Sequence, residues 1–170
     1  TLWLTEEYKM DYEYFLQRIH GVIMPSTGCT EPVAIALNTA TARANAQGEV
    51  RHLTITLDNY LYKNAMGVGI PGADERGVAL CAAMGVTAGD ATAKMRVLDH
   101  VSPEALGAAK KMVAEGRVTV KTRSDVHGLL VESVLETDSD TVRVLTLQSH
   151  TNIVRVDHAP FEAYVENEDG

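Results

Sequence analysis

Apolar residues recur at helical spacing near the start of the chain. Residues 5–20 begin with Thr5 and two glutamates, which is typical of a helix N-terminus, and apolar side chains then return every three or four positions. These apolar positions are Leu4, Tyr8, Tyr12, Phe15 and Ile19. We therefore predict an amphipathic helix over residues 5–20, with its aromatic side chains packed in the core.

Three further segments have the composition of helices. Residues 31–47 are rich in Ala, Leu and Ile and are followed by Gly48, a residue type that often ends helices. Residues 78–88 are apolar on every side, as in a buried helix. Another helix is expected to begin at Ser102, which precedes a proline, and to end at Gly116.

Elsewhere the helical period gives way to alternation of apolar and polar residues. In residues 50–58, Leu53, Ile55 and Leu57 share one face of a predicted strand. Short runs rich in Val, Leu and Thr, separated by polar turns, then cover residues 117–123, 129–137, 141–147 and 153–157. These runs predict an antiparallel meander. Helices segregated from strands favour an α+β fold, with a mostly antiparallel sheet concentrated in the C-terminal third.

The composition is that of an ordinary globular protein of about one domain. Of the 170 residues, 45% are hydrophobic and 22% are charged. The formal net charge of -8 argues against a nucleic-acid partner, and no apolar run approaches the length of a membrane span. The two cysteines, Cys29 and Cys81, are too few for a disulfide framework, so we expect the protein to be located in the reducing cytoplasm. Cys81 lies in the apolar segment 78–88 and is expected to fill the core.

The first segment with candidate chemistry covers residues 26–32, with the sequence STGCTEP. Thr30 is expected to cap the following helix, with Glu31 and Pro32 in its first turn. Cys29 would then lie just outside the positive end of the helix, which favours a thiolate able to bind a metal or attack a substrate. The alternative is that Cys29 is a small buried hydrophobic residue.

A second segment, residues 59–72, is rich in glycine and is predicted to be irregular. Its end formally matches the dinucleotide motif G-x-G-x-x-G, but no buried strand precedes it and Pro71 has no usual place there, so we reject that interpretation. A tight glycine loop that lets the backbone approach a small ligand, or simply a turn, is favoured instead. Lys63 and Asn64 at its entrance suit a carboxylate, or they are simply solvated.

A third segment, residues 149–152 with the sequence SHTN, forms the predicted turn between two strands. Turn chemistry explains Ser149, Thr151 and Asn152. His150 adds a group that titrates near neutrality and can act as a base or a donor. The spacing supports neither a hydrolase triad nor a zinc site.

Together the three segments resemble the L-cysteine desulfidase family, which is related to the α chain of iron–sulfur L-serine dehydratases. Residues 28–32 (GCTEP), 62–72 (YKNAMGVGIPG) and 150–153 (HTNI) are similar to that family's three signatures and occur in the same order. The resemblance covers essentially the whole chain. It implies a lyase that converts L-cysteine or L-serine to pyruvate, ammonia and sulfide or water. It also implies a [4Fe-4S] cluster with one open iron acting as a Lewis acid.

The resemblance assigns roles to individual residues. Cys29 corresponds to the signature cysteine, as a cluster ligand or alternatively as a catalytic thiol. Lys63 and His150 become catalytic residues. The substrate-binding residues are Thr30, Glu31, Asn64, Gly67, Thr151 and Asn152.

Members of that family are longer, and their other cluster cysteines lie in the C-terminal half. We therefore expect residues 1–170 to be a single domain, the N-terminal portion of a longer chain, inactive and without a cluster by itself. Its expected partners are an amino-acid substrate and either a second copy or the missing half. Two alternatives remain open: a non-catalytic amino-acid-binding or regulatory module, and a subunit whose partner chain supplies the cysteines. The residues do not distinguish cysteine from serine as substrate.

Overall fold

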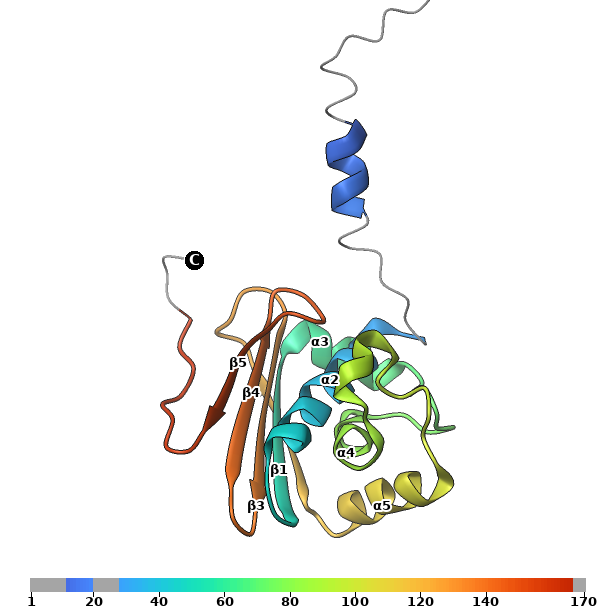
Figure 1. Ribbon diagram of the computed structural model, residues 1–170, viewed down its shortest axis with the longest axis vertical. Helices are drawn as coiled ribbons and strands as arrows, with labels where there is room; N and C mark the ends of the chain where they lie inside the picture. The colour runs from blue at the N-terminus through green and yellow to red at the C-terminus, as the bar shows by residue number, and fades with distance from the viewer. Residues whose placement is uncertain (1–11, 20–27, 167–170) are drawn as a thin grey trace, which may run out of the picture.

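A mixed β-sheet covered on one face by helices forms the body of the protein (Figure 1). The computed structural model describes residues 12–19, which are helical, and residues 28–166. The elements of the longer range are α2 Thr30–Asn45, β1 Val50–Asp58, α3 Asn59–Gly67, α4 Val78–Ala88, the 3-10 helix η1 Ala91–Arg96, α5 Pro103–Ala114, β2 Val118–Arg123, β3 Leu130–Thr137, β4 Thr141–Leu147 and β5 Ile153–His158.

The strands of the described sheet lie in the order β2-β1-β3-β4-β5. Strands β3, β4 and β5 form the predicted antiparallel meander, and β1 pairs antiparallel with β3, so the α+β prediction is confirmed. The expectation that β2 belongs to this meander is wrong, because β2 pairs in parallel with β1 on the other side. The helices between β1 and β2 carry the chain back to the end where β1 begins, and a parallel pair requires such a crossover.

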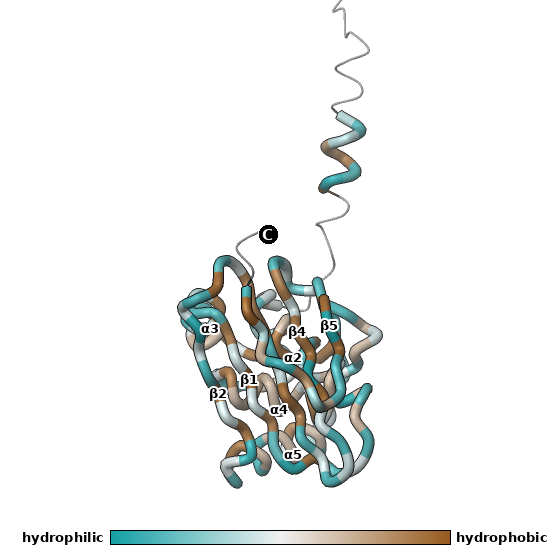
Figure 2. The backbone as a smooth tube through the Cα atoms, turned by 90° about the vertical axis from the view of Figure 1, so that its left-hand side faces the viewer, coloured by the Kyte–Doolittle hydropathy of each residue, from teal (hydrophilic) through white to brown (hydrophobic). Residues whose placement is uncertain are grey.

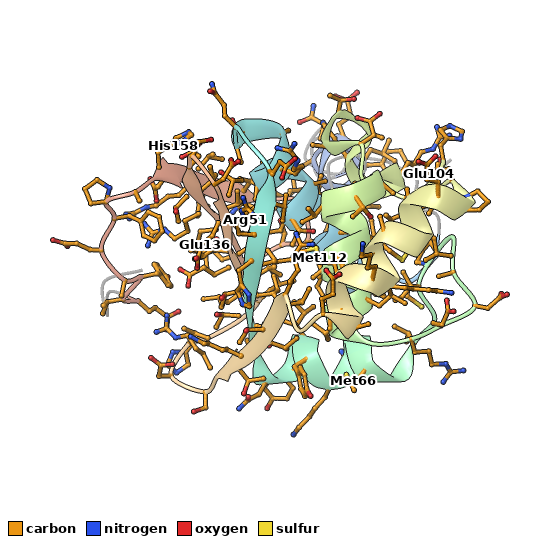
Figure 3. The ribbon with its side chains drawn as sticks, turned by 90° about the horizontal axis from the view of Figure 1, so that it is seen from below. Arg51, Met66, Glu104, Met112, Glu136 and His158 are labelled. Atoms are coloured by element: carbon orange, nitrogen blue, oxygen red, sulfur yellow. The ribbon has the colours of Figure 1, made fainter. Side chains whose placement is uncertain are left out.

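The two faces of the sheet differ in character. Leu53, Ile55 and Leu57 of β1 are completely buried in the core, as their alternation predicted. Figure 2 shows apolar and polar stretches interspersed along the strands. Seen from below in Figure 3, Met112 of α5 lies between that helix and the sheet, whereas Glu136 of β3 lies on the opposite side.

Helix α2 lies between the sheet and α4, and residues 32–40 are all buried (Figure 1). This arrangement depends on a close approach of the two helices. A Cβ added to Gly85 of α4 would lie 2.4 Å from the carbonyl oxygen of Ala36 and 2.0 Å from Oγ1 of Thr39. No larger residue fits at this position without moving the helices apart.

Residues 59–67 form helix α3, so the expectation that residues 59–72 are irregular is wrong for the first nine of them. The cause is Asp58, whose Oδ1 accepts hydrogen bonds from the backbone N–H groups of Tyr60 and Leu61, each at 2.9 Å. This cap starts a helix whose buried face is formed by Leu61 and Ala65.

The predicted N-terminal helix is present where the chain is described, but its aromatic side chains are not core residues. Tyr12, Phe15 and Ile19 are 65%, 61% and 46% exposed, and Tyr8 lies outside the described residues. Helical spacing defines an apolar face, but it does not determine what covers that face.

The other predicted helices are confirmed. Helix α4 has the predicted bounds, and α5 begins after Ser102, whose hydroxyl accepts the N–H of Ala105 at 3.1 Å. Gly116 follows α5 with a φ of 70°, in the left-handed region that glycine tolerates. No helix within the described ranges is long and apolar enough to cross a membrane.

Residues 159–166 run back along the sheet face that the helices leave open (Figure 1). Arg143 of β4, which is 3% exposed, pairs with Asp157, and its guanidinium carbon lies 4.6 Å from the ring centre of Phe161. Arg123 at the end of β2 donates a hydrogen bond to the carbonyl oxygen of Tyr164 at 2.9 Å. Two arginines thus hold this segment against the sheet.

Replacing Gly85 with alanine is expected to lower the free energy of unfolding by about 1–3 kcal/mol, because the added methyl group overpacks the contact between α2 and α4. Gly107 of α5 is the matched control, since a Cβ added there meets no atom within 4 Å. Gly107→Ala should raise stability by about 0.5–1 kcal/mol, as alanine favours a helix more than glycine does. Urea unfolding measures both changes. Shifts of the same sign in the two variants would contradict the close contact.

Candidate functional site

The start of α2, helix α3 and the turn between β4 and β5 lie at one end of the fold (Figure 1). The strand register explains this arrangement. Leu130 at the start of β3 pairs with Leu147 at the end of β4, and its backbone N–H donates to Oδ2 of Asp58 at the end of β1. The segments that follow β1 and β4 therefore emerge on the same side of the sheet, and the three motifs that are distant in sequence share one end of the molecule.

Cys29 is the residue at the N-terminal boundary of α2, with an extended backbone (φ -65°, ψ 137°) and an exposed side chain. The expectation that Thr30 caps this helix is wrong, because Thr30 is already its first helical residue. The Thr30 hydroxyl donates instead to the Glu31 carboxylate at 3.2 Å. The side chain of Cys29 makes no capping hydrogen bond, so within the described residues no side chain at the N-cap position occupies the first N–H groups of α2.

The first and second motifs are neighbours in space. Asn64 of α3 donates from Nδ2 to Oε1 of Glu31 at 3.5 Å. In the loops beside them, a Cβ added to Gly28 would lie 3.1 Å from Cγ of Pro71. The glycine-rich loop therefore packs against the segment that carries Cys29, although the two are about forty positions apart in the sequence.

Lys63 and Gly67 lie on the same helix as Asn64. Consecutive helical residues point about 100° apart, so Lys63 and Asn64 do not project in the same direction. Both side chains are exposed. Gly67 is the last residue of α3, and its carbonyl oxygen accepts a hydrogen bond from Nη1 of Arg76 at 3.0 Å. A helix rather than a buried strand precedes the glycines, so the rejection of a dinucleotide fold is confirmed.

The turn of the third motif is held mainly by its own backbone. The N–H of Leu147 donates to the carbonyl oxygen of Asn152 at 3.1 Å, and Gln148 adopts a left-handed φ of 67°. Asn152 also donates from Nδ2 to the carbonyl oxygen of Leu147 at 3.0 Å. The side-chain amide nitrogen of Asn152 therefore stabilises the turn. The half-buried side chains of His150 and Thr151 make no hydrogen bond to the residues that the structure describes.

Cys81 is confirmed as a core residue and is unsuited to bind a metal. It is 2% exposed, and its thiol donates a hydrogen bond to the carbonyl oxygen of Pro32 at 2.9 Å. Burial raises the pKa of Cys81 to about 12, so it stays a thiol at neutral pH. Cys29 is thus the one described cysteine whose sulfur faces solvent.

The described residues do not complete a metal site by themselves. Over residues 12–19 and 28–166, no group of three or more His, Cys, Asp or Glu side chains could hold a metal ion. A cubane cluster is normally held by several thiolates. Cys29 can supply one such ligand, and any others would have to come from outside the described residues.

Two polar residues that organise this end of the fold were not predicted. Asp58 could have been recognised as an N-cap, since it is an acidic residue at the end of a strand pattern. Asn38 lies in the middle of α2 and is completely buried. Its role could not be predicted from the sequence, because a lone Asn in an Ala-rich helix becomes notable only once the burial of that helix is known.

No family model matches the chain. The chain is similar to proteins named UPF0597: it is 35% identical over 149 residues to one from Oleidesulfovibrio alaskensis and 34% identical over 152 residues to one from Photobacterium profundum. A third, from Porphyromonas gingivalis, is 36% identical over 137 residues. These matches cover 88%, 89% and 80% of the chain but 35%, 35% and 32% of the relatives. The chain thus spans about a third of the length of these relatives, whose names state no activity.

In the native protein, iodoacetamide is expected to alkylate Cys29 and to leave Cys81 unmodified. At pH 8 a thiol with a pKa of about 12 is only roughly one part in 10⁴ thiolate, and Cys81 is also shielded from reagent. Peptide mapping by mass spectrometry, before and after denaturation in urea, measures the two sites separately. Denaturation should make both thiols reactive. Equal rates at the two cysteines in the native protein would contradict the assignment of Cys81 to the core.

Proposed function

We propose that this chain is part of a lyase of the L-cysteine desulfidase type, which converts L-cysteine to pyruvate, ammonia and hydrogen sulfide. The observation that carries the proposal is the position of the three motifs at one end of the fold, with Glu31 and Asn64 in contact (Figure 1). The similarity to the longer UPF0597 proteins is compatible with the proposal but does not test it.

The charges at this end suit an amino acid. Cys29 at the N-cap position makes no capping hydrogen bond, so in this proposal the first N–H groups of α2 donate to the substrate carboxylate, which the helix dipole also attracts. In this proposal Lys63 reinforces that attraction, and the Glu31 carboxylate, held by Thr30 and Asn64, receives the substrate ammonium. Thr151, Asn152 and the backbone of Gly67 complete the binding surface.

The reaction is an elimination followed by hydrolysis. In this proposal His150 is the base that removes the α proton of L-cysteine, while the Lys63 ammonium stays protonated and holds the carboxylate. The electron pair forms the Cα–Cβ double bond, and the Cβ–S bond breaks to release hydrosulfide. The resulting aminoacrylate takes up water and loses ammonia to give pyruvate. With L-serine the same steps expel water in place of sulfide.

Within this proposal, Cys29 is a thiolate ligand of a [4Fe-4S] cluster or a catalytic thiol. The exposed position of Cys29 fits a ligand, and the further thiolates would come from outside the described residues. When bound, the cluster would supply an open iron that acts as a Lewis acid toward the substrate. The absence of a disulfide between the two cysteines agrees with a reducing, cytoplasmic location, which we infer as part of the same proposal.

Cys29→Ser is expected to abolish pyruvate formation in the complete protein, reconstituted anaerobically with iron and sulfide and assayed with L-cysteine and L-serine. Loss of activity with altered iron–sulfur absorption would make Cys29 a ligand. Loss with unaltered absorption would make it a catalytic thiol. Cys81→Ala is the control and should retain activity, because Cys81 lies in the core.

Two results would contradict the lyase. The first is a reconstituted wild-type protein that binds no cluster and makes no pyruvate. The second is full activity in Cys29→Ser. Stabilisation of the metal-free protein by an amino acid, without turnover, would favour the binding-module alternative.

Lys63→Ala is expected to raise KM for L-cysteine by about 10–100-fold, the effect of losing a hydrogen bond between charged groups. The matched control is Lys121→Ala, since Lys121 is also an exposed lysine but lies on β2 and in none of the three motifs. Steady-state kinetics of pyruvate release compare the two variants. An unchanged KM in Lys63→Ala, or an equal rise in Lys121→Ala, would remove Lys63 from the site.

A further inference from the structure

Asn38 is the polar residue that ties α2 to the sheet. Its Nδ2 lies 3.0 Å from the carbonyl oxygen of Val131 in β3, and 3.2 Å and 2.9 Å from the carbonyl oxygen of Val144 and Oγ1 of Thr146 in β4. Among the hydrogen bonds of the described residues, those of Asn38 alone join α2 to these two strands. The acceptors on two strands determine which way the amide points.

The other end of this amide makes Asn38 unusual. Its Oδ1 is buried and has no hydrogen-bond partner among the described residues. An unpaired buried acceptor is unfavourable, and an apolar residue of similar size would avoid it. The donor end therefore has to account for the presence of an asparagine here.

The contact with Thr146 coincides with an irregularity in the sheet. Leu145 pairs with Arg155, but Thr146 pairs with Ile153, so the β4–β5 register shifts between these two pairs and leaves Val154 without an opposite residue. Such bulges bend a strand and redirect the residues that follow. The turn that carries His150 begins directly after this bulge.

The same helix carries the first motif. Asn38 lies eight residues after Thr30, about 12 Å along the helix axis. Between them α2 is buried on every side and packed against α4, so it acts as a rigid rod. The position of β4 relative to Asn38 therefore sets the position of the β4–β5 turn relative to the start of α2.

We propose that Asn38 is a positioning residue, whose amide aligns the turn bearing His150, Thr151 and Asn152 with the N-terminus of α2 bearing Cys29, Thr30 and Glu31. Its catalytic consequence rests on the proposed lyase function. Its structural consequence is that the turn is held in place by the contact between Asn38 and Thr146, beside the bulge. This consequence does not depend on the lyase function. The two consequences are measured separately.

The variant is Asn38→Leu, which keeps a side chain of similar size and removes the donor. The matched control is Thr39→Val: Thr39 is the next residue, is equally buried, and donates only to carbonyl oxygens of its own helix, at Ile35 and Ala36. Hydrogen exchange by mass spectrometry follows the peptide covering residues 144–156 in the complete protein. We expect exchange there to accelerate at least about tenfold in Asn38→Leu and to stay at the wild-type rate in Thr39→Val.

The kinetic measurement uses pyruvate formation from L-cysteine, under conditions where circular dichroism shows both variants folded. We expect kcat/KM to fall by about 10–100-fold in Asn38→Leu, through changes in both kcat and KM, and by less than about threefold in Thr39→Val. If the wild-type protein makes no pyruvate, the lyase proposal fails, and the exchange measurement alone decides the role of Asn38.

Unchanged exchange in a folded Asn38→Leu variant would overturn the positioning role, and so would an equal acceleration in Thr39→Val. Faster exchange with an unchanged kcat/KM would overturn the catalytic consequence. If Asn38→Leu does not fold, Thr146→Val replaces it, because it removes one of the three partners and keeps the shape of the side chain. Acceleration in that variant, smaller than tenfold but in the same peptide, would support the proposal, and wild-type exchange would overturn it.

Discussion

The burial of α2 on every side is the constraint on which the rest of the structure depends. The helix is enclosed by the sheet and α4, and the contact at Gly85 brings α4 so close to Ala36 that no side chain fits between them. Residues 32–40 of a helix in this position cannot place polar groups in solvent, so Thr39 donates to carbonyl oxygens of its own helix and Asn38 donates to the strands. Both ends of α2 reach the surface: Asn45 is exposed at its C-terminal end, and Cys29 is exposed directly before its first residue.

Asp58 has a comparable role for α3. Its two carboxylate oxygens accept three backbone N–H groups, two from the first turn of α3 and one from the start of β3. A buried carboxylate is tolerated because each of these bonds satisfies a donor that would otherwise be unpaired. The same side chain thus starts α3 and joins it to the sheet. The hydrogen bond from Asn64 to Glu31 then joins α3 to the first turn of α2, at the end of the fold where the candidate site lies.

Local patterns made much of the fold predictable, and non-local contacts explain what was missed. Strand 50–58 and helix 78–88 have the predicted bounds because alternation and uniform apolarity are read from neighbouring residues. The sequence pattern does not predict helix α3, because Asp58, which caps it, is also the last residue of a strand pattern. The parallel pairing of β2 depends on a crossover that no short sequence pattern encodes. For the site, composition and spacing identified each motif separately. That Glu31 contacts Asn64, and that Thr30 begins the helix and does not cap it, follow from tertiary structure.

The two cysteines illustrate how position decides what the same chemical group can do. Burial keeps Cys81 protonated, and its thiol donates a hydrogen bond to the carbonyl oxygen of Pro32. Cys81 therefore contributes to the packing between α4 and α2. Cys29, fifty-two positions earlier, is exposed at the start of a helix whose first turn carries Glu31, the hydrogen-bond partner of Asn64. A cluster needs several thiolates, whereas an amino acid needs only charges of both signs at suitable places. In the proposed lyase, the end of the fold that carries Glu31 and Asn64 is therefore better suited to binding the substrate than to binding the cluster. Cys29 is the residue there that could contribute to cluster binding.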